Sequence, residues 1–230
     1  MHPSATRLPT LRGVGLGLRR EIMADWITQP DAPIDFIEIA PENWMHLGGR
    51  SAKVLQPFSE RYPMVCHGLS LSLGGTAPLD WDFLKQLKSF FTQHKVALYT
   101  EHLSFCSDAS HVYDLLPVPF THEMVHYIAA RIRQVQDFLE RRIAIENTSY
   151  YVQSPLNQMD ELTFVNAVLQ EADCDLQLDV NNVFVNSGNH AFDAAAYIKG
   201  LPQNSVVYMH IAGHEQMEKN LIIDTHGADV

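Results

Sequence analysis

The stretch 121–147 reads THEMVHYIAARIRQVQDFLERRIAIEN and joins two patterns of different period. Over 122–141, apolar side chains recur every three or four residues, which predicts an amphipathic helix that begins after the N-cap residue Thr121. The run 143–146, IAIE, is apolar up to Glu146 and follows two arginines, which predicts a short buried strand directly after this helix. The recurring apolar residues of the helix are Met124, Ile128, Ile132, Val135 and Leu139.

The same alternation of strand and helix extends along the chain in both directions. Another helix is predicted over 81–92 with Asp80 as its N-cap, and Asp160 is a further N-cap candidate. This rhythm is typical of βαβ units in a parallel sheet and favours an α/β fold, the (β/α)8 TIM barrel. An open doubly wound sheet is the alternative, but the third glycine of its phosphate-binding motif is missing after Gly13, Gly15 and Gly17. The predicted strands are 14–18, 36–40, 64–67, 96–102, 143–146, 176–180 and 206–211.

The spacing of these strands limits how much of a barrel the chain can form. They start about 32 residues apart on average, so seven units fit into 230 residues, whereas a complete barrel typically takes about 250. The segment 221–226, LIIDTH, resembles a strand in composition, but it follows the seventh strand by fewer residues than a parallel crossover needs. We therefore place it in the loop after strand seven. We expect one domain over 1–230 that lacks the last helix, the eighth strand and the final helix.

Composition and charge narrow the classes of partner. Acidic residues outnumber basic ones by 27 to 16, which gives a net charge of −11 and disfavours nucleic acid as a ligand. No apolar run approaches the roughly 20 residues that cross a bilayer, and the N-terminus lacks the apolar core of a signal peptide. We expect a cytoplasmic protein without membrane contact. Cys66, Cys106 and Cys174 form no C-x-x-C pair, so neither a disulfide framework nor a thiolate zinc site is indicated.

Polar side chains gather where the predicted strands end. In a barrel these ends form one mouth, where active sites are built. A single histidine after a strand is usually structural, but several imidazoles and carboxylates in one mouth need cations to compensate them. So many nitrogen and oxygen ligands predict two or three metal ions that share a bridging carboxylate. The residues at these ends are Glu38, Glu42, Asn43, His67, Glu101, His102, Glu146, Asn147, Asp179, Asn181, Asn182, His190, His210, His214, Asp224 and His226.

The order of these motifs resembles a known family. HGLS at His67, EHLSF around His102, IEN at Glu146 and DVNNVFVNSGNHAFD from Asp179 are followed by HIAGH and DTHG. Together with LRGVGLGLR and FIEIAPENW near the N-terminus, they are similar to the multinuclear non-haem iron-dependent oxidative enzymes, the family of the methanobactin-biosynthesis oxidase. That family resembles in turn the xylose-isomerase-like superfamily of metal-dependent barrels.

The resemblance implies a site, a reaction and partners. It implies two or three iron ions, with His67 and His102 on one ion, Glu146 as a bridge, and Asp179, His190, His210, Asp224 and His226 on the others. Asn182 and His214 are further ligand candidates, and we take Glu146, Asp179 and His210 as the catalytic residues. The implied reaction uses dioxygen to modify cysteines of a ribosomally made precursor peptide, with a separate protein recognising that peptide. The family's last ligand is a glutamate on strand eight, for which no position is found here.

Two other classes of function stay open from the sequence. The first is a zinc- or manganese-dependent hydrolase or isomerase of the same superfamily, although no lysine falls at a predicted strand end as sugar isomerases would need. The second is an inert scaffold or metal-binding module, suggested by the strand edges that an open barrel exposes. The identity of the bound metal discriminates between the first of these and the oxidase.

Overall fold

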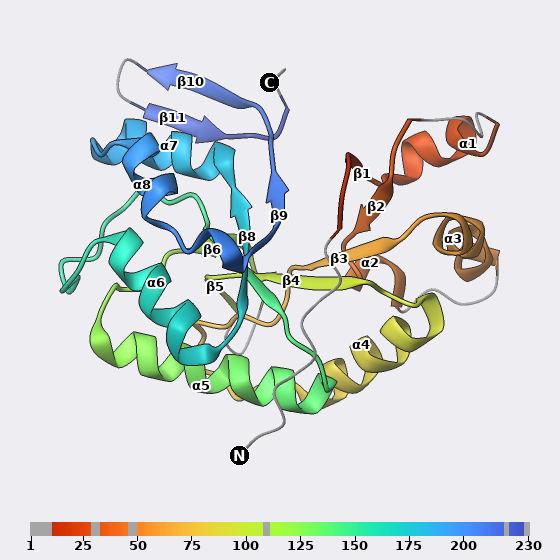
Figure 1. Ribbon diagram of the computed structural model, residues 1–230, viewed down its shortest axis with the longest axis horizontal. Coiled ribbons are helices and arrows are strands. Elements are labelled where there is room, and N and C mark those ends of the chain that lie inside the picture. Colours follow the sequence, from red (N-terminus) through yellow and green to blue (C-terminus); the bar gives the residue numbers. More distant parts are fainter. Residues whose placement is uncertain (1–10, 29–32, 46–49, 108–110, 219–220, 228–230) are drawn as a thin grey trace.

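The computed structural model describes residues 11–28, 33–45, 50–107, 111–218 and 221–227. Its centre is a seven-stranded sheet in the order β1-β2-β3-β4-β7-β8-β9, and every neighbouring pair in it is parallel (Figure 1). This confirms the predicted barrel-type α/β fold with seven strands. The strands are β1 (Gly15–Gly17), β2 (Phe36–Ile39), β3 (Met64–Gly68), β4 (Leu98–His102), β7 (Ala144–Glu146), β8 (Asp175–Asp179) and β9 (Val206–His210).

The sheet curls so that its far strands face each other across the interior. Phe36 on β2 packs against Tyr208 on β9, with ring centroids 5.6 Å apart. Val65 and Leu98 join the same apolar cluster from β3 and β4. A flat sheet would hold β2 and β9 far apart, so these contacts mark the inside of an incompletely closed barrel.

Helices cover the outer face of the sheet, where α4, α5 and α6 lie side by side (Figure 1). The predicted N-caps are confirmed, because the side chains of Asp80, Thr121 and Asp160 accept hydrogen bonds from the first turns of these three helices. Within the described ranges, no helix is long and apolar enough to span a membrane. The helices are α1 (Arg20–Thr28), α2 (Glu42–Met45), α3 (Arg50–Arg61), α4 (Trp81–His94), α5 (His122–Leu139), α6 (Glu161–Ala172), α7 (Val180–His190), α8 (Ala194–Gly200) and the 3₁₀ turn η1 (Gln203–Ser205).

The segment after β8 differs from the prediction, which extended the strand to Val180 and counted His190 among the residues at the strand ends. Asp179 ends the strand, and its side chain accepts a hydrogen bond from the Asn182 amide at 2.7 Å, so α7 begins at Val180. The asparagines and the glycine of this helix are weak helix formers, which concealed it. Its buried Val183 and Val185 show that tertiary packing outweighs propensity here.

Two antiparallel hairpins extend from the sheet, and the sequence predicted neither. β5 (Phe105–Ser107) pairs with β6 (His111–Leu116), and β10 (His214–Glu218) pairs with β11 (Leu221–Asp224). The segment 221–226 is thus partly a strand rather than a loop, but its partner is β10 and not β1, which confirms its exclusion from the barrel. The Asn189 side chain of α7 fixes β11 by exchanging two hydrogen bonds with the Ile222 backbone, at 2.8 and 2.9 Å.

Candidate metal centre

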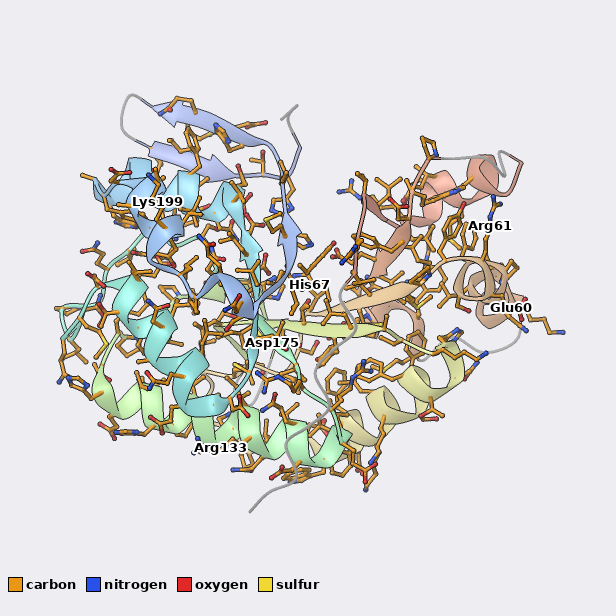
Figure 2. All side chains as sticks on the ribbon, in the orientation of Figure 1. Glu60, Arg61, His67, Arg133, Asp175 and Lys199 are labelled. Atoms are coloured by element: carbon orange, nitrogen blue, oxygen red, sulfur yellow. The ribbon has the colours of Figure 1, made fainter. Side chains whose placement is uncertain are left out.

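Strand register brings the polar side chains of the sequence prediction to one mouth. His102 stands opposite Glu146 in the β4–β7 ladder, and Asp179 stands opposite His210 in the β8–β9 ladder. His67 completes the row from β3 and lies near the middle of the molecule (Figure 2). Because the strands are parallel, all five residues meet at the carboxyl edge of the sheet, where barrel active sites are built.

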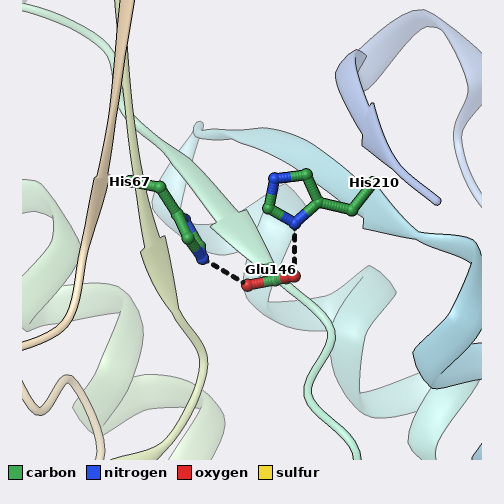
Figure 3. A group of neighbouring side chains, drawn as sticks. All are labelled: His67, Glu146 and His210. Carbon is green, nitrogen blue, oxygen red and sulfur yellow. Dashed lines mark hydrogen bonds and ion pairs between the residues drawn. The ribbon is translucent and has the colours of Figure 1, made fainter. Parts of the chain in front are cut away.

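Four of these residues form what we call the inner group: His67, His102, Glu146 and His210. Glu146 Oε2 lies 2.9 Å from His67 Nε2 and 3.2 Å from His102 Nε2, while its Oε1 lies 3.3 Å from His210 Nδ1. The two Nε2 atoms of His67 and His102 are 3.1 Å apart. The carboxylate therefore stands between the imidazoles of His67 and His210 (Figure 3), and His102 contacts the same oxygen as His67.

Neighbouring groups orient the imidazoles of the inner group. His67 Nδ1 lies 2.7 Å from the Thr100 hydroxyl, and His102 Nδ1 lies 2.8 Å from the Gly68 carbonyl oxygen. A carbonyl oxygen can only accept, so His102 donates from Nδ1 and its Nε2 faces Glu146. Metal-binding histidines are commonly oriented by such a bond on the second nitrogen.

Three further side chains contact His210. The sequence analysis counted Glu38 among the donors at the strand ends, but it gave Gln177 and Tyr208 no role. Glu38 Oε2 lies 2.6 Å from His210 Nε2 and accepts a hydrogen bond from Tyr208 Oη at 2.6 Å. Gln177 Nε2 lies 2.9 Å from His210 Nδ1. Gln177 and Tyr208 each precede a predicted site residue by two positions, which puts them on the same strand face. That alternation was the sequence signal that could have found them.

A second set, the outer group, comprises Asn181, His214, Asp224 and His226. Asn181 Nδ2 donates to Asp224 Oδ1 at 2.8 Å, and its Oδ1 lies 2.9 Å from His214 Nδ1. His226 Nε2 lies 3.1 Å from Asp224 Oδ1, so the D-x-H spacing does bring its two side chains together. The β10–β11 hairpin and the first turn of α7 hold this group beside the barrel mouth.

Asp179 stands between the two groups. Its Oδ2 lies 3.6 Å from His210 Nδ1 and 3.9 Å from His226 Nε2, while its Oδ1 is engaged in the helix cap. Asp179 Oδ2 and Glu146 Oε2 are both buried, yet within the described part of the chain neither has an aligned hydrogen-bond donor. Buried carboxylate oxygens rarely lack a donor, so these two oxygens, flanked by imidazoles, fit metal coordination.

The protonation equilibria of the inner group reflect its concentration of negative charge. Burial lowers the pKa of His210, but the carboxylates of Asp179, Glu146 and Glu38 outweigh burial and raise it to about 12. Burial raises the pKa of Glu146, but the charges of His67 and His102 bring it well below its ordinary value. Burial and the neighbouring His67 lower the pKa of His102 to about 4. Three carboxylates thus surround His210, and their negative charge favours a proton or a metal cation at this place.

Three further predicted residues, Asn147, Asn182 and Glu101, are buried and form hydrogen bonds with neighbouring residues. Asn147 exchanges two hydrogen bonds with the Asp179 backbone, and Asn182 donates to the Asn147 carbonyl oxygen at 2.9 Å. The side-chain oxygen of Asn182 is buried without a donor in the described residues. Glu101 accepts a hydrogen bond from Tyr99 Oη at 2.7 Å, and burial and the charge of Glu42 raise its pKa to about 8.

His190 is not brought to the inner or the outer group. It ends α7, an 11-residue helix that carries it about 16 Å from Asp179. Its ring stacks on Tyr150 with centroids 4.3 Å apart, and its Nε2 lies 2.9 Å from the Tyr150 carbonyl oxygen. The prediction placed His190 with the metal ligands at the strand ends, but α7 carries it away from the mouth.

The fold resembles that of sugar epimerases of known structure. The chain superposes on L-ribulose 3-epimerase with a TM-score of 0.59 at 13% identity, covering 88% of this chain and 70% of that one. For D-allulose 3-epimerase from Methylomonas sp. the TM-score is 0.57 at 15% identity, with 89% and 73% covered. At these identities the likeness concerns the barrel-type fold alone.

Closer relatives share the sequence along nearly the whole chain. A UPF0276 protein of Nitrosospira multiformis is 60% identical over 224 residues, which cover 97% of this chain and 79% of the relative. A UPF0276 protein of Neisseria gonorrhoeae is 50% identical over 222 residues, which cover 96% and 79%. The family model described as RiPP precursor modification enzyme MbnB/TglH/ChrH, where RiPP denotes a ribosomally made and later modified peptide, matches residues 13–230. The chain therefore belongs to the MbnB/TglH/ChrH family of RiPP precursor modification enzymes.

Proposed function

We propose that this chain holds two or three iron ions at the barrel mouth and uses dioxygen to modify cysteine residues of a ribosomally made precursor peptide. The observation that carries the proposal is the row of donors in which Glu146 and Asp179 alternate with imidazoles from His67 to His226. The family match supports a peptide precursor as the substrate class. Ions bound there would supply the Lewis acidity and the redox chemistry with dioxygen that cysteine oxidation requires.

The donor set favours iron over a structural zinc site. Cys66, Cys106 and Cys174 are buried and belong to no candidate metal-ligand group among the described residues, so the row offers nitrogen and oxygen donors. Mixed imidazole and carboxylate ligands suit non-haem iron, and they also suit manganese and catalytic zinc. His67, His102, Glu146, Asp179, His210, Asp224 and His226 would hold the ions.

The chain's own residues would then perform three tasks. Glu38 and Tyr208 hold the His210 ring in one orientation, and Asn147 fixes the Asp179 backbone. Burial keeps bulk water from the carboxylates of the row, since Glu146 and Asp179 are 2% and 0% exposed. Ligands so placed need little rearrangement when metal and substrate bind, which is the general basis of preorganised catalysis.

A separate protein would deliver the peptide. The mouth is occupied by ligands and by the side chains that orient them, which leaves little surface to bind a leader sequence. We therefore expect the peptide to bind tightly only when a recognition protein encoded near this gene is present. Tight binding of the leader by this chain alone would contradict that expectation.

Metal analysis of the purified protein, combined with turnover of a cysteine-containing precursor peptide, tests the proposal. We expect two to three iron ions per chain, a visible absorption band, and a peptide mass change that requires dioxygen. Turnover under strict anaerobiosis would overturn the oxidase proposal. Colourless protein that contains zinc or manganese and is active without dioxygen would indicate the hydrolase or isomerase alternative instead.

A further inference from the structure

A cavity of about 500 Å³ opens beside the metal centre, at the carboxyl ends of β1 and β2. Its polar and aromatic lining residues are Arg19, Arg20, Glu21, Glu38, Asn43 and Trp44. Glu38 belongs to both places, because its Oε2 contacts His210 Nε2 at 2.6 Å. The cavity is therefore next to the proposed ligand row.

The Arg20 guanidinium is held in place by contacts that leave its charge unpaired. Its Nη2 donates to the Asn43 carbonyl oxygen at 2.9 Å, and the group stands over the Trp44 ring, 5.4 Å from the centroid. Among the described residues no carboxylate lies within ion-pair distance of Arg19 or Arg20. A guanidinium fixed by a stacked ring and one carbonyl keeps further N–H donors for a ligand.

These two arginines contrast with the acidic character of their surroundings. The chain carries a net charge of −11, and the barrel mouth gathers Glu38, Glu146 and Asp179. Two adjacent arginines beside this acidic mouth favour the binding of a negatively charged group of the ligand. In an unmodified peptide, the anions other than a cysteine thiolate are carboxylates, which match the guanidinium fork in geometry.

We propose that Arg19 and Arg20 bind a carboxylate of the substrate peptide and so position its cysteine at the metal centre. This inference rests on the proposed function, because it takes a cysteine peptide as the substrate. The carboxylate has two sources in a peptide, the C-terminal α-carboxylate of the cysteine itself and the side chain of a neighbouring acidic residue. Arg19 and Arg20 are positioning residues in this arrangement.

Two matched pairs of probes distinguish these sources. N-acetylcysteine and N-acetylcysteinamide differ only in the α-carboxylate, and the amidated dipeptides N-acetyl-Cys-Asp and N-acetyl-Cys-Asn differ only in the side-chain carboxylate. Affinities are measured by NMR titration of metal-free protein and by the thiolate-to-iron absorption band of iron-loaded protein. We expect the carboxylate member of one pair to bind about tenfold more tightly, as charge-assisted hydrogen bonds allow.

The variant Arg20→Gln should remove this preference, and Arg20→Lys should restore only part of it. The matched control is Arg61→Gln, since Arg61 also stands over a ring, that of Tyr62 at 5.1 Å, but it ends α3 just before β3 begins, on the amino side of the sheet. Circular dichroism checks folding. If Arg20→Gln fails to fold, Arg19→Gln carries the test, because the Arg19 side chain makes no described hydrogen bond. In that variant we expect the preference for the carboxylate probe to fall by at least about threefold.

Equal affinity for both members of both pairs in the unaltered protein would overturn the inference whatever the variants do. A preference that persists unchanged in Arg19→Gln and Arg20→Gln would overturn it as well. Failure of the proposed function is distinguishable, since a protein that binds no iron but prefers carboxylate probes when metal-free would refute only the oxidase. Iron binding with no carboxylate preference would refute only the role of the arginines.

Discussion

Glu146 and Glu161 are both buried carboxyl groups, 2% and 8% exposed, yet their protonation equilibria shift in opposite directions. Glu146 lies among His67, His102 and His210, which bring its pKa well below the ordinary value despite burial. Glu161 accepts hydrogen bonds from Tyr197 Oη at 3.0 Å and from Asn186 Nδ2 at 3.3 Å, and burial raises its pKa to about 7. Burial is common to both residues, so the neighbouring side chains decide the direction of the pKa shift.

This difference separates a metal site from a structural polar cluster. Neutral hydroxyl and amide donors satisfy the Glu161 oxygens but cannot offset the loss of hydration of a full charge. Imidazoles can be protonated or can bind a metal ion. The histidines around Glu146 can therefore release protons when a metal cation binds. His190 belongs to the region of Glu161, since both line a cavity of about 420 Å³ between α6, α7 and α8.

The largest loss of metal affinity is expected from Glu146→Gln. An amide offers one neutral oxygen where the carboxylate offers two charged ones, so the inner group loses the charge that binds cations. We expect at least about a hundredfold loss of metal affinity with unchanged circular dichroism. Metal per chain after dialysis measures it. Glu161→Gln is the matched control and should retain its metal, so equal metal content in Glu146→Gln and the unaltered protein would remove Glu146 from the ligand set.

A partial loss of bound metal is expected from Asp179→Asn. Asparagine preserves the N-cap of α7, so the helix should remain while the link between the inner and outer groups is weakened. We expect about one ion fewer per chain, measured by metal analysis at saturating iron. Asp193→Asn alters a comparable cap on α8 and should keep the full metal content. An unchanged ion count in Asp179→Asn would confine Asp179 to its capping role.

Glu161→Gln should change the pH dependence of stability. The folded pKa of about 7 exceeds the ordinary value of 4.5, so the folded protein binds more protons between these values. Stability therefore falls as pH rises from about 4.5 to 7, and Glu161 contributes on the order of 3 kcal/mol to that fall. Urea unfolding of metal-free protein at pH 5 and pH 8 should show Glu161→Gln gaining relative to the unaltered protein at pH 8. The same difference at both pH values would contradict the raised pKa.

The smallest effect is expected from His190→Ala. Removal of the ring loses its stacking on Tyr150, which destabilises the fold by about 1 kcal/mol. Metal content should stay unchanged, because His190 contacts neither the inner nor the outer group. The paired variant His226→Ala should lose metal from the outer group. Loss of metal in His190→Ala comparable to that in His226→Ala would show that His190 is a ligand after all.

Most of the fold was predictable because the strands and the long helices carry strong periodic signals. The hydrophobic period of 122–141 gave α5, and Asp80, Thr121 and Asp160 marked helix starts through their capping chemistry. α7 and the hairpin β10–β11 were not predicted. Their stability comes from tertiary contacts, such as those between Asn189 and Ile222, which local propensity does not report.

The site was predictable to the extent that strand ends converge. His67, His102, Glu146, Asp179 and His210 meet because parallel strands share one carboxyl edge, and Asp224 meets His226 through a spacing of two. The position of His190 was not predictable without knowing that α7 intervenes. Glu38 meets Tyr208 and His210 only because the sheet curls, which brings β2 and β9 together across the barrel.

X-ray diffraction at the iron absorption edge, on crystals of aerobically purified protein, tests the central claim most directly. We expect two or three anomalous peaks along the row from His67 and His102, past Glu146 and His210, to Asp179 and His226. The peak beside Glu146 should be the strongest, since the inner group is the more buried of the two. An iron-free row in protein that modifies its peptide, or iron bound only at a site away from Glu146, would contradict the claim.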